Sequence, residues 1–171
     1  MSDVFPALPV EVHPLSGPDE AVLAHGPCFG LVSVRLEFAA GSVGEARAGS
    51  TALALEMLER GTLRRDRGGL RRALDALGAR LGVRVGRNGS AVALRALEEV
   101  LPEALALLEE VLLEPADDAE ELADAVAEMD EALEAERVEP GAVVGRLLGP
   151  ALWPGLPWAA PSDGTRASRA G

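Results

Sequence analysis

The sequence contains no lysine, no isoleucine and no tyrosine, and only 3% of its 171 residues are aromatic. All sixteen basic residues are therefore arginine, and they stand against 28 acidic residues, which gives a formal net charge of −12. This acidic balance argues against nucleic acid as a partner, because phosphate backbones are bound by an excess of basic side chains. With 48% hydrophobic residues and so few aromatic ones, the core is expected to consist of Leu, Val and Ala.

Cysteine and histidine are also scarce. The single Cys28 cannot form an internal disulfide, and a lone thiol is more often a small core residue than a nucleophile, so we assign it no role. His13 and His25 are the only imidazoles, and both are expected at strand ends near the surface and not as metal ligands. No apolar run approaches the roughly 20 residues of a membrane span, and no basic stretch precedes the apolar N-terminal residues. These absences predict a cytoplasmic protein without a membrane partner.

Period-two alternation and Leu residues spaced three to four apart predict a single α+β domain over residues 1–171. The clearest strand is Leu31–Phe38, which alternates apolar and polar residues as a half-buried antiparallel strand does. A hairpin is expected around the turn at Asn88 and Gly89. Further strands are expected at 10–13 and 21–25, as edge strands, and at 81–85 and 92–96. Helices are expected at 49–62, 64–77, 98–115 and 119–137, the last capped by Asp117 or Asp118.

The two signs of charge are separated along the chain. Nine arginines lie between Arg60 and Arg87, whereas Glu98 to Glu136 contains no basic residue. Such segments can face an oppositely charged surface, either in the same chain or in a partner. The simpler interpretation, which we favour from the sequence, is two solvated helix faces of opposite sign.

The stretch Gly49–Thr62, GSTALALEMLERGT, has the apolar recurrence of a buried helix, and Gly61 stands where a C-terminal cap belongs. It resembles the signature helix of the M16 metallopeptidases (insulinase, pitrilysin and processing peptidases), in which His-x-x-Glu-His and Met-Leu precede Gly-Thr. Aligned on Gly-Thr, the resemblance places Ala52 at the first zinc-binding His, Leu55 at the catalytic Glu and Glu56 at the second His.

These replacements decide what the resemblance implies about chemistry. A zinc peptidase needs two imidazoles one helical turn apart to hold the ion, and a carboxylate that takes a proton from the metal-bound water. Ala52 and Leu55 can do neither. The resemblance therefore implies that no catalytic residue remains and that zinc, the cofactor of the family, is not bound.

The third zinc ligand of the family, a Glu on a long helix, falls near Leu133 or Ala132, and neither is acidic. Glu128, Glu131 and Glu134 lie near enough for a slip of one turn to bring one of them there. Glu56 with Glu131 or Glu134 would at most form a weak all-oxygen cation site. Solvent-facing carboxylates on an acidic helix are the interpretation that we favour.

The resemblance extends from about Val10 to Thr165. It includes the connection AAGSVGEARAG, the helix LRRALDALGA and the segment WPGLPWAAPSDGT. In that last segment, Trp153, Leu156 and Trp158 occupy aromatic and His positions of the family. The resemblance implies an antiparallel or mixed sheet with helices packed on one face. It also implies a further helix and strand after Gly171, so the domain is expected to be incomplete at its C-terminus.

Three functions remain open from the sequence. The first is a catalytically inactive M16-like domain, the non-catalytic subunit or half of a bipartite zinc peptidase whose second chain or domain carries the metal. The second is a regulatory or structural subunit that such a partner requires for activity, as in a heterodimer. In both, the edge of the strand Leu31–Phe38 is a candidate for peptide binding by strand addition. The third is an unrelated protein-binding α+β domain that uses its acidic helix.

Overall fold

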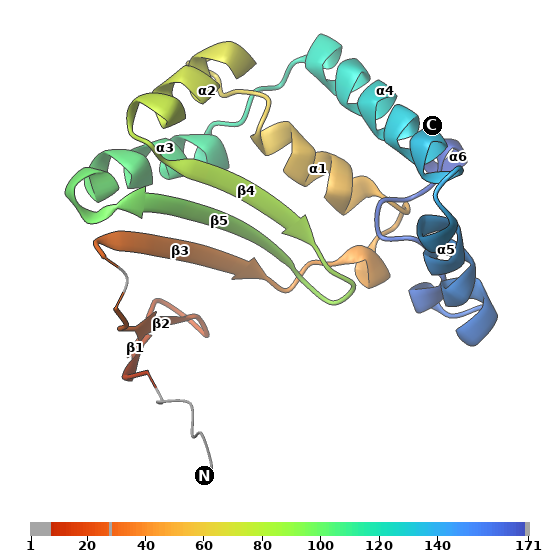
Figure 1. Ribbon diagram of the computed structural model, residues 1–171, viewed down its shortest axis with the longest axis horizontal. Coiled ribbons are helices and arrows are strands. Elements are labelled where there is room, and N and C mark those ends of the chain that lie inside the picture. The colour runs from red at the N-terminus through yellow and green to blue at the C-terminus, as the bar shows by residue number, and fades with distance from the viewer. Residues whose placement is uncertain (1–7, 28, 170–171) are drawn as a thin grey trace.

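The computed structural model describes residues 8–27 and 29–169 and contains two antiparallel sheets (Figure 1). Cys28 lies outside the described residues. The small sheet pairs β1 (Val10–Pro14) with β2 (Glu20–Ala24). The main sheet has the order β3-β5-β4, built from β3 (Leu31–Phe38), β4 (Arg80–Val85) and β5 (Ser90–Leu97).

The α-helices are α1 (Ser50–Leu58), α2 (Arg67–Ala76), α3 (Leu101–Leu113), α4 (Ala119–Glu136), α5 (Pro140–Leu152) and α6 (Arg166–Arg169). The 3-10 helices are η1 (Ser42–Gly44), η2 (Glu98–Val100) and η3 (Pro157–Ala159).

The core lies between one face of the main sheet and the helices. Val92, Leu94 and Ala96 alternate along β5 toward this core, where they pack with Leu55 of α1 and Leu108 of α3. Leu residues at helical spacing in α1, α2 and α3 supply the opposing apolar stripes. The predicted α+β class, with helices on one face of an antiparallel sheet, is confirmed.

The two N-terminal strands do not border the main sheet as the predicted edge strands were expected to do. They pair with each other, with Val12 opposite Val22, in a hairpin that lies apart from the main sheet (Figure 1). Val12 and Val22 are each more than half exposed. His13 and His25 are exposed on this hairpin beside Glu11, so the histidines lie at the surface as expected. Alternation predicts strands but carries no information about which neighbour they pair with.

Side-chain caps explain where α2 and α4 begin. The Asp66 side chain accepts a hydrogen bond from the backbone N–H of Gly69, so α2 starts at Arg67 and not at Arg64. Asp118, the second of the two predicted caps, accepts from the first turn of α4. The prediction that Gly61 caps α1 is wrong, because the helix ends at Leu58.

Gly61 shapes the following loop instead. Its φ is +132°, and a Cβ placed there would lie 2.7 Å from the carbonyl oxygen of Arg65. This residue therefore has to be glycine for the loop to close.

Within the described residues, no helix has both the length and the apolarity needed to cross a membrane.

Candidate functional site

The three positions that the resemblance aligns with the zinc motif, Ala52, Leu55 and Glu56, all lie on α1, but their side chains have different surroundings. Leu55 is only 8% exposed and belongs to the core that includes Val92 and Leu94. Ala52 is half-buried and offers only a methyl group. Glu56 is half-buried, with its carboxylate directed to an arginine. The position that the resemblance assigns to a catalytic carboxylate is therefore part of the hydrophobic core.

The centre of the site is Arg60, at the end of the same helical segment. Its side chain is 1% exposed, and it links α1 to α4. Nη2 donates to Glu128 at 2.7 Å and to Glu56 at 3.1 Å. Nη1 lies 3.5 Å from a carboxylate oxygen of Glu121. One guanidinium thus binds three carboxylates from two helices.

The charges in this cluster stabilise one another. Burial opposes the charge of Arg60, but hydrogen bonds with Glu128 and Glu56 outweigh burial and raise the pKa of its guanidinium. Hydrogen bonds from Arg67 and Arg60 lower the pKa of Glu128 to about 2. The Arg60 guanidinium therefore remains a fixed positive charge beside Glu56 at any physiological pH.

The zinc ion of the M16 family does not fit these residues. Ala52 and Leu55 carry no donor atom, and the carboxylate of Glu56, the one oxygen ligand among the three, already contacts a guanidinium. A divalent cation bound by Glu56 would lie within a few ångströms of the Arg60 charge, which repels it. No catalytic step through a metal follows from this geometry.

The weaker cation site considered from the sequence is not assembled either. Glu131 is exposed, and Glu134 lies 3.1 Å from Arg137 and 3.9 Å from Arg166. Among residues 8–27 and 29–169, no group of three or more His, Cys, Asp or Glu side chains is placed to hold a metal ion. Of the three acidic residues near the family's third ligand, the one that faces α1 is Glu128, and it contacts arginines.

The Gly-Thr pair after α1 has a structural role. The Thr62 side chain is buried, and its hydroxyl donates to Glu110 at 2.6 Å while accepting from the backbone N–H groups of Arg64 and Arg65. The Arg64 guanidinium forms two hydrogen bonds of 2.6 Å with Glu114. Arg65 pairs with Glu110. The loop is thereby fixed to the end of α3.

These ion pairs correct the interpretation of the charge separation. The basic segment was expected to be a solvated helix face, yet four of its nine arginines pair with the acidic segment of the same chain. They are Arg60, Arg64, Arg65 and Arg67, and their long-range partners are Glu110, Glu114, Glu121 and Glu128. Much of the charge asymmetry is therefore neutralised internally.

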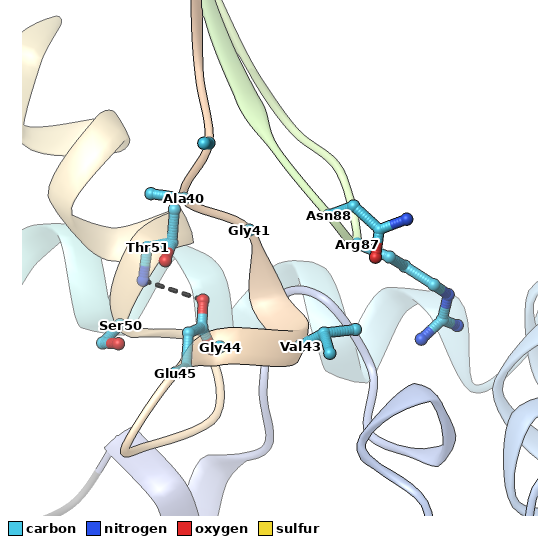
Figure 2. Close-up of a pocket in the computed structure, with 10 residues that line it drawn as sticks. Ala40, Gly41, Val43, Gly44, Glu45, Ser50, Thr51, Arg87 and Asn88 are labelled. Carbon is cyan, nitrogen blue, oxygen red and sulfur yellow. Dashed lines mark hydrogen bonds between the residues drawn. The ribbon is translucent and has the colours of Figure 1, made fainter.

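A pocket of about 430 Å³ lies at the N-terminus of α1 (Figure 2). Glu45, from the loop after η1, accepts hydrogen bonds from the backbone N–H groups of Gly49 and Thr51 at 2.6 and 3.0 Å. These are the groups that a helix N-terminus would otherwise present to an anion. Because the Glu45 carboxylate already accepts hydrogen bonds from these N–H groups, they are not available to an anion. The carboxylate instead holds the start of the motif helix in place.

The C-terminal segment crosses the start of α1 at close range. Gly49 has a φ of +91°, and a Cβ on it would lie 2.7 Å from the carbonyl oxygen of Asp163. The Ser168 hydroxyl donates to the carbonyl oxygen of Ala48 at 2.7 Å. Trp153 and Trp158, from the segment that resembles the family's aromatic motif, are 41% and 39% exposed, so they pack at the rim of the molecule.

Sequence reasoning missed Arg60, although the sequence carries a signal for it. Arg60 follows Glu56 by four residues at the end of an apolar helix, which is the spacing of an intrahelical ion pair. Its burial and its contacts with Glu121 and Glu128 depend on the packing of α4, which no local pattern reveals.

Comparison with known proteins agrees with this architecture. The chain is similar to a solved structure of a peptidase M16 inactive domain from Pseudomonas fluorescens, with 28% identity, a TM-score of 0.87 and coverage of 95% of this chain and 40% of that one. A protease from Helicobacter pylori shares the fold at 13% identity, with a TM-score of 0.84 and the same coverage. The chain thus spans less than half the length of either. No curated protein matches the sequence. The family model described as insulinase (peptidase family M16) matches residues 21–161, and the chain therefore belongs to this family.

Proposed function

We propose that this chain is a non-catalytic M16 domain that serves as one half of a bipartite zinc peptidase. The observation that carries the proposal is the content of α1: an apolar core side chain at Leu55 and a carboxylate at Glu56 neutralised by buried Arg60. A helix with these side chains can form part of the wall of a substrate cavity, but it has no group that activates a water molecule. The second chain or domain would supply the metal and the catalytic residues.

The charge cluster supports a scaffolding role for α1 and α4. In this domain Arg60 joins the two helices through Glu56 and Glu128, with hydrogen bonds of 3.1 and 2.7 Å. A fixed guanidinium preserves the spacing of the helices without an ion. The helix pair therefore retains the shape of an M16 domain in the absence of its chemistry.

The main sheet offers a surface for the substrate of such a pair. In the described part of the chain β3 pairs only with β5, so its outer edge is open, and Leu31 and Phe38 at its ends are 47% and 41% exposed. Open strand edges bind extended peptides through backbone hydrogen bonds, which require no metal. Peptide held on this edge would be presented to the metal-bearing partner.

The test is reconstitution with an M16 chain from the same organism that has an intact His-x-x-Glu-His helix. We expect the two chains to co-purify and the pair to cleave peptides in a chelator-sensitive way. Glu56→Gln in this chain should leave the turnover of the pair unchanged, whereas Glu→Gln in the partner's motif should abolish it. Absence of both a complex and any change in the partner's activity would contradict the proposal.

The same experiment separates the second candidate, a subunit that the partner requires for activity. If the partner alone cleaves peptides at the rate of the pair, this chain is not required, and only the binding role remains. If the partner alone is inactive and this chain restores it, the regulatory role is supported. A domain that only binds a basic protein through α4 would instead show salt-sensitive binding and no effect on cleavage.

A further inference from the structure

The face of the main sheet that lies opposite the core carries a group of arginines. Residues directly opposite in antiparallel strands point to the same face, so the register places Arg95 beside Arg80, Ala93 beside Gly82 and Ala91 beside Arg84. In Figure 1 helix α3 lies behind the left ends of β4 and β5, and no helix crosses in front of the three strands. We call this the open face of the sheet.

Three of these arginines have no ion-pair partner among the described residues. Arg80, Arg84 and Arg95 are exposed, and the part of the chain that the structure describes places no carboxylate within ion-pairing distance of them. Arg80 and Arg95 stand directly opposite each other. Like charges at opposite positions destabilise a sheet, so this pair is unfavourable for folding alone. The net charge of the chain is −12, yet within its described part these three arginines, like the exposed Arg47 and Arg71 elsewhere, form no ion pair.

The arginines surround a shallow centre of small residues. Ala93 and Gly82 lie side by side between the row of Arg95 and Arg80 and the row of Arg84. A Cβ built on Gly82 would have no heavy atom within 4 Å, so the space above the centre of the face is free. A backbone can approach the sheet closely over Gly82, on the side of the row away from the long side chain of Arg35.

The spacing of the charges indicates the form of the ligand. The fourth arginine, Arg35 of β3, is opposite Ala93 and forms an ion pair with Glu37 of the same face. The arginines without an ion pair therefore lie in the two outer of three successive rows, Arg80 and Arg95 in one and Arg84 in the other. The rows are two residues apart, or roughly 6.6 Å along a strand. Side chains on one face of an extended peptide repeat at the same interval. We propose that the open face binds an extended acidic peptide with carboxylates at alternate positions, of which those over the two outer rows meet the unpaired arginines.

Two other occupants fit less well. Single-stranded nucleic acid also repeats its charges, but it is bound through stacking on aromatic side chains. The face consists of Arg, Ala and Gly with Ser33 and Glu37, and of Leu31 and Leu97 at one end, so it offers no aromatic side chain. A second copy of the chain would bring another net charge of −12 to the interface. An acidic peptide needs only arginine side chains, because the planar guanidinium can form two hydrogen bonds with one carboxylate.

This inference is independent of the non-catalytic role that we propose for the site on α1. The open face and the motif helix belong to different surfaces, and neither argument uses the residues of the other. Failure of peptide binding would leave the proposed non-catalytic role intact, and discovery of zinc on α1 would leave the open face unchanged.

The experiment measures fluorescence anisotropy of a labelled peptide with four Glu-Ser repeats, added to the whole chain in low salt. Exposed ion pairs are each worth up to about 1 kcal/mol, so Arg84→Glu should weaken binding by roughly 3- to 10-fold. Arg47→Glu makes the same change of charge at an exposed arginine in the loop before α1, and it should have little effect. Raising the salt concentration should weaken binding to the wild-type chain.

Gly82 provides a second, matched pair of variants. Gly82→Glu places a carboxylate in the free space at the centre of the face and should weaken binding, whereas Gly82→Ser should not. Circular dichroism of each variant verifies that the sheet is retained. The proposal is overturned if the peptide with Gln-Ser repeats binds as well as the acidic one, or if Arg84→Glu behaves like Arg47→Glu. Tighter binding of an oligonucleotide, or a dimer in sedimentation that Arg84→Glu dissociates, would assign the face to another occupant and also overturn it.

Discussion

Replacing Leu55 with glutamate tests whether the position of the family's catalytic carboxylate has become part of the core. The side chain is 8% exposed and packs with buried residues of β5 and α3. Loss of its apolar burial costs about 2 kcal/mol. An unpartnered carboxyl group in the same place costs about 2 kcal/mol more, since protein interiors penalise a polar group without a hydrogen bond. The expected loss of about 4 kcal/mol is a large part of the stability of a domain of this size.

The loss should depend on pH in a definite direction. Burial disfavours the charged form, so the folded state would bind a proton on Glu at position 55 more tightly than the unfolded state does. The destabilisation is then smallest below the unfolded pKa of about 4.3 and increases as the pH rises above it. A surface carboxylate on a solvated helix would show no such increase.

Urea unfolding followed by far-ultraviolet circular dichroism measures the effect, with Leu55→Met as the matched control. Because Met conserves volume and polarity, the control should lose less than about 1.5 kcal/mol. A loss of less than about 1 kcal/mol for Leu55→Glu at pH 7, within the range of ordinary surface substitutions, would show that Leu55 is not a core position. The position would then be open to a functional carboxylate.

Further changes test the charge cluster, the loop and the crossing of the C-terminal segment. Arg60→Met should reduce the free energy of unfolding by about 1 to 3 kcal/mol at pH 7, because hydrogen bonds to charged groups are lost. Since the pKa of Glu128 is lowered to about 2, its contribution is present above the unfolded pKa and is lost as the pH falls toward 2, so the two proteins should converge in urea titrations at low pH. Thr62→Val should cost about 1 to 3 kcal/mol by leaving buried polar groups unpaired, and equal urea midpoints would contradict this role. Gly49→Ala should lower the melting temperature through its positive φ and its close backbone neighbour, whereas Gly145→Ala, in free space within α5, should not.

Local patterns predicted the elements well because each is determined by neighbouring residues. The alternation of Leu31–Phe38, the Asn88-Gly89 turn and the Asp118 cap all act within a few residues, and the structure contains β3, the β4–β5 hairpin and α4 where they indicate. The family model and the similar structures confirm the M16 resemblance that rests on Gly, Pro and Leu spacing.

The parts that the sequence did not reveal depend on contacts between distant segments. The pairing of Arg64 with Glu114 joins residues 50 positions apart, and periodicity does not specify such a contact. The two N-terminal strands have the composition of edge strands, yet they pair with each other and not with the main sheet. Arg60 is the clearest example, since a charged residue is expected at the surface and here is 1% exposed because three carboxylates surround it.

Whether the motif helix has lost its metal chemistry is decided by metal content and peptide cleavage, measured together on the purified chain after incubation with excess zinc and removal of the unbound ion. We expect substoichiometric zinc and no chelator-sensitive cleavage, because the motif helix carries Ala52, Leu55 and an Arg60-paired Glu56. One zinc ion per chain, together with peptide cleavage that a chelator abolishes and zinc restores, would contradict it.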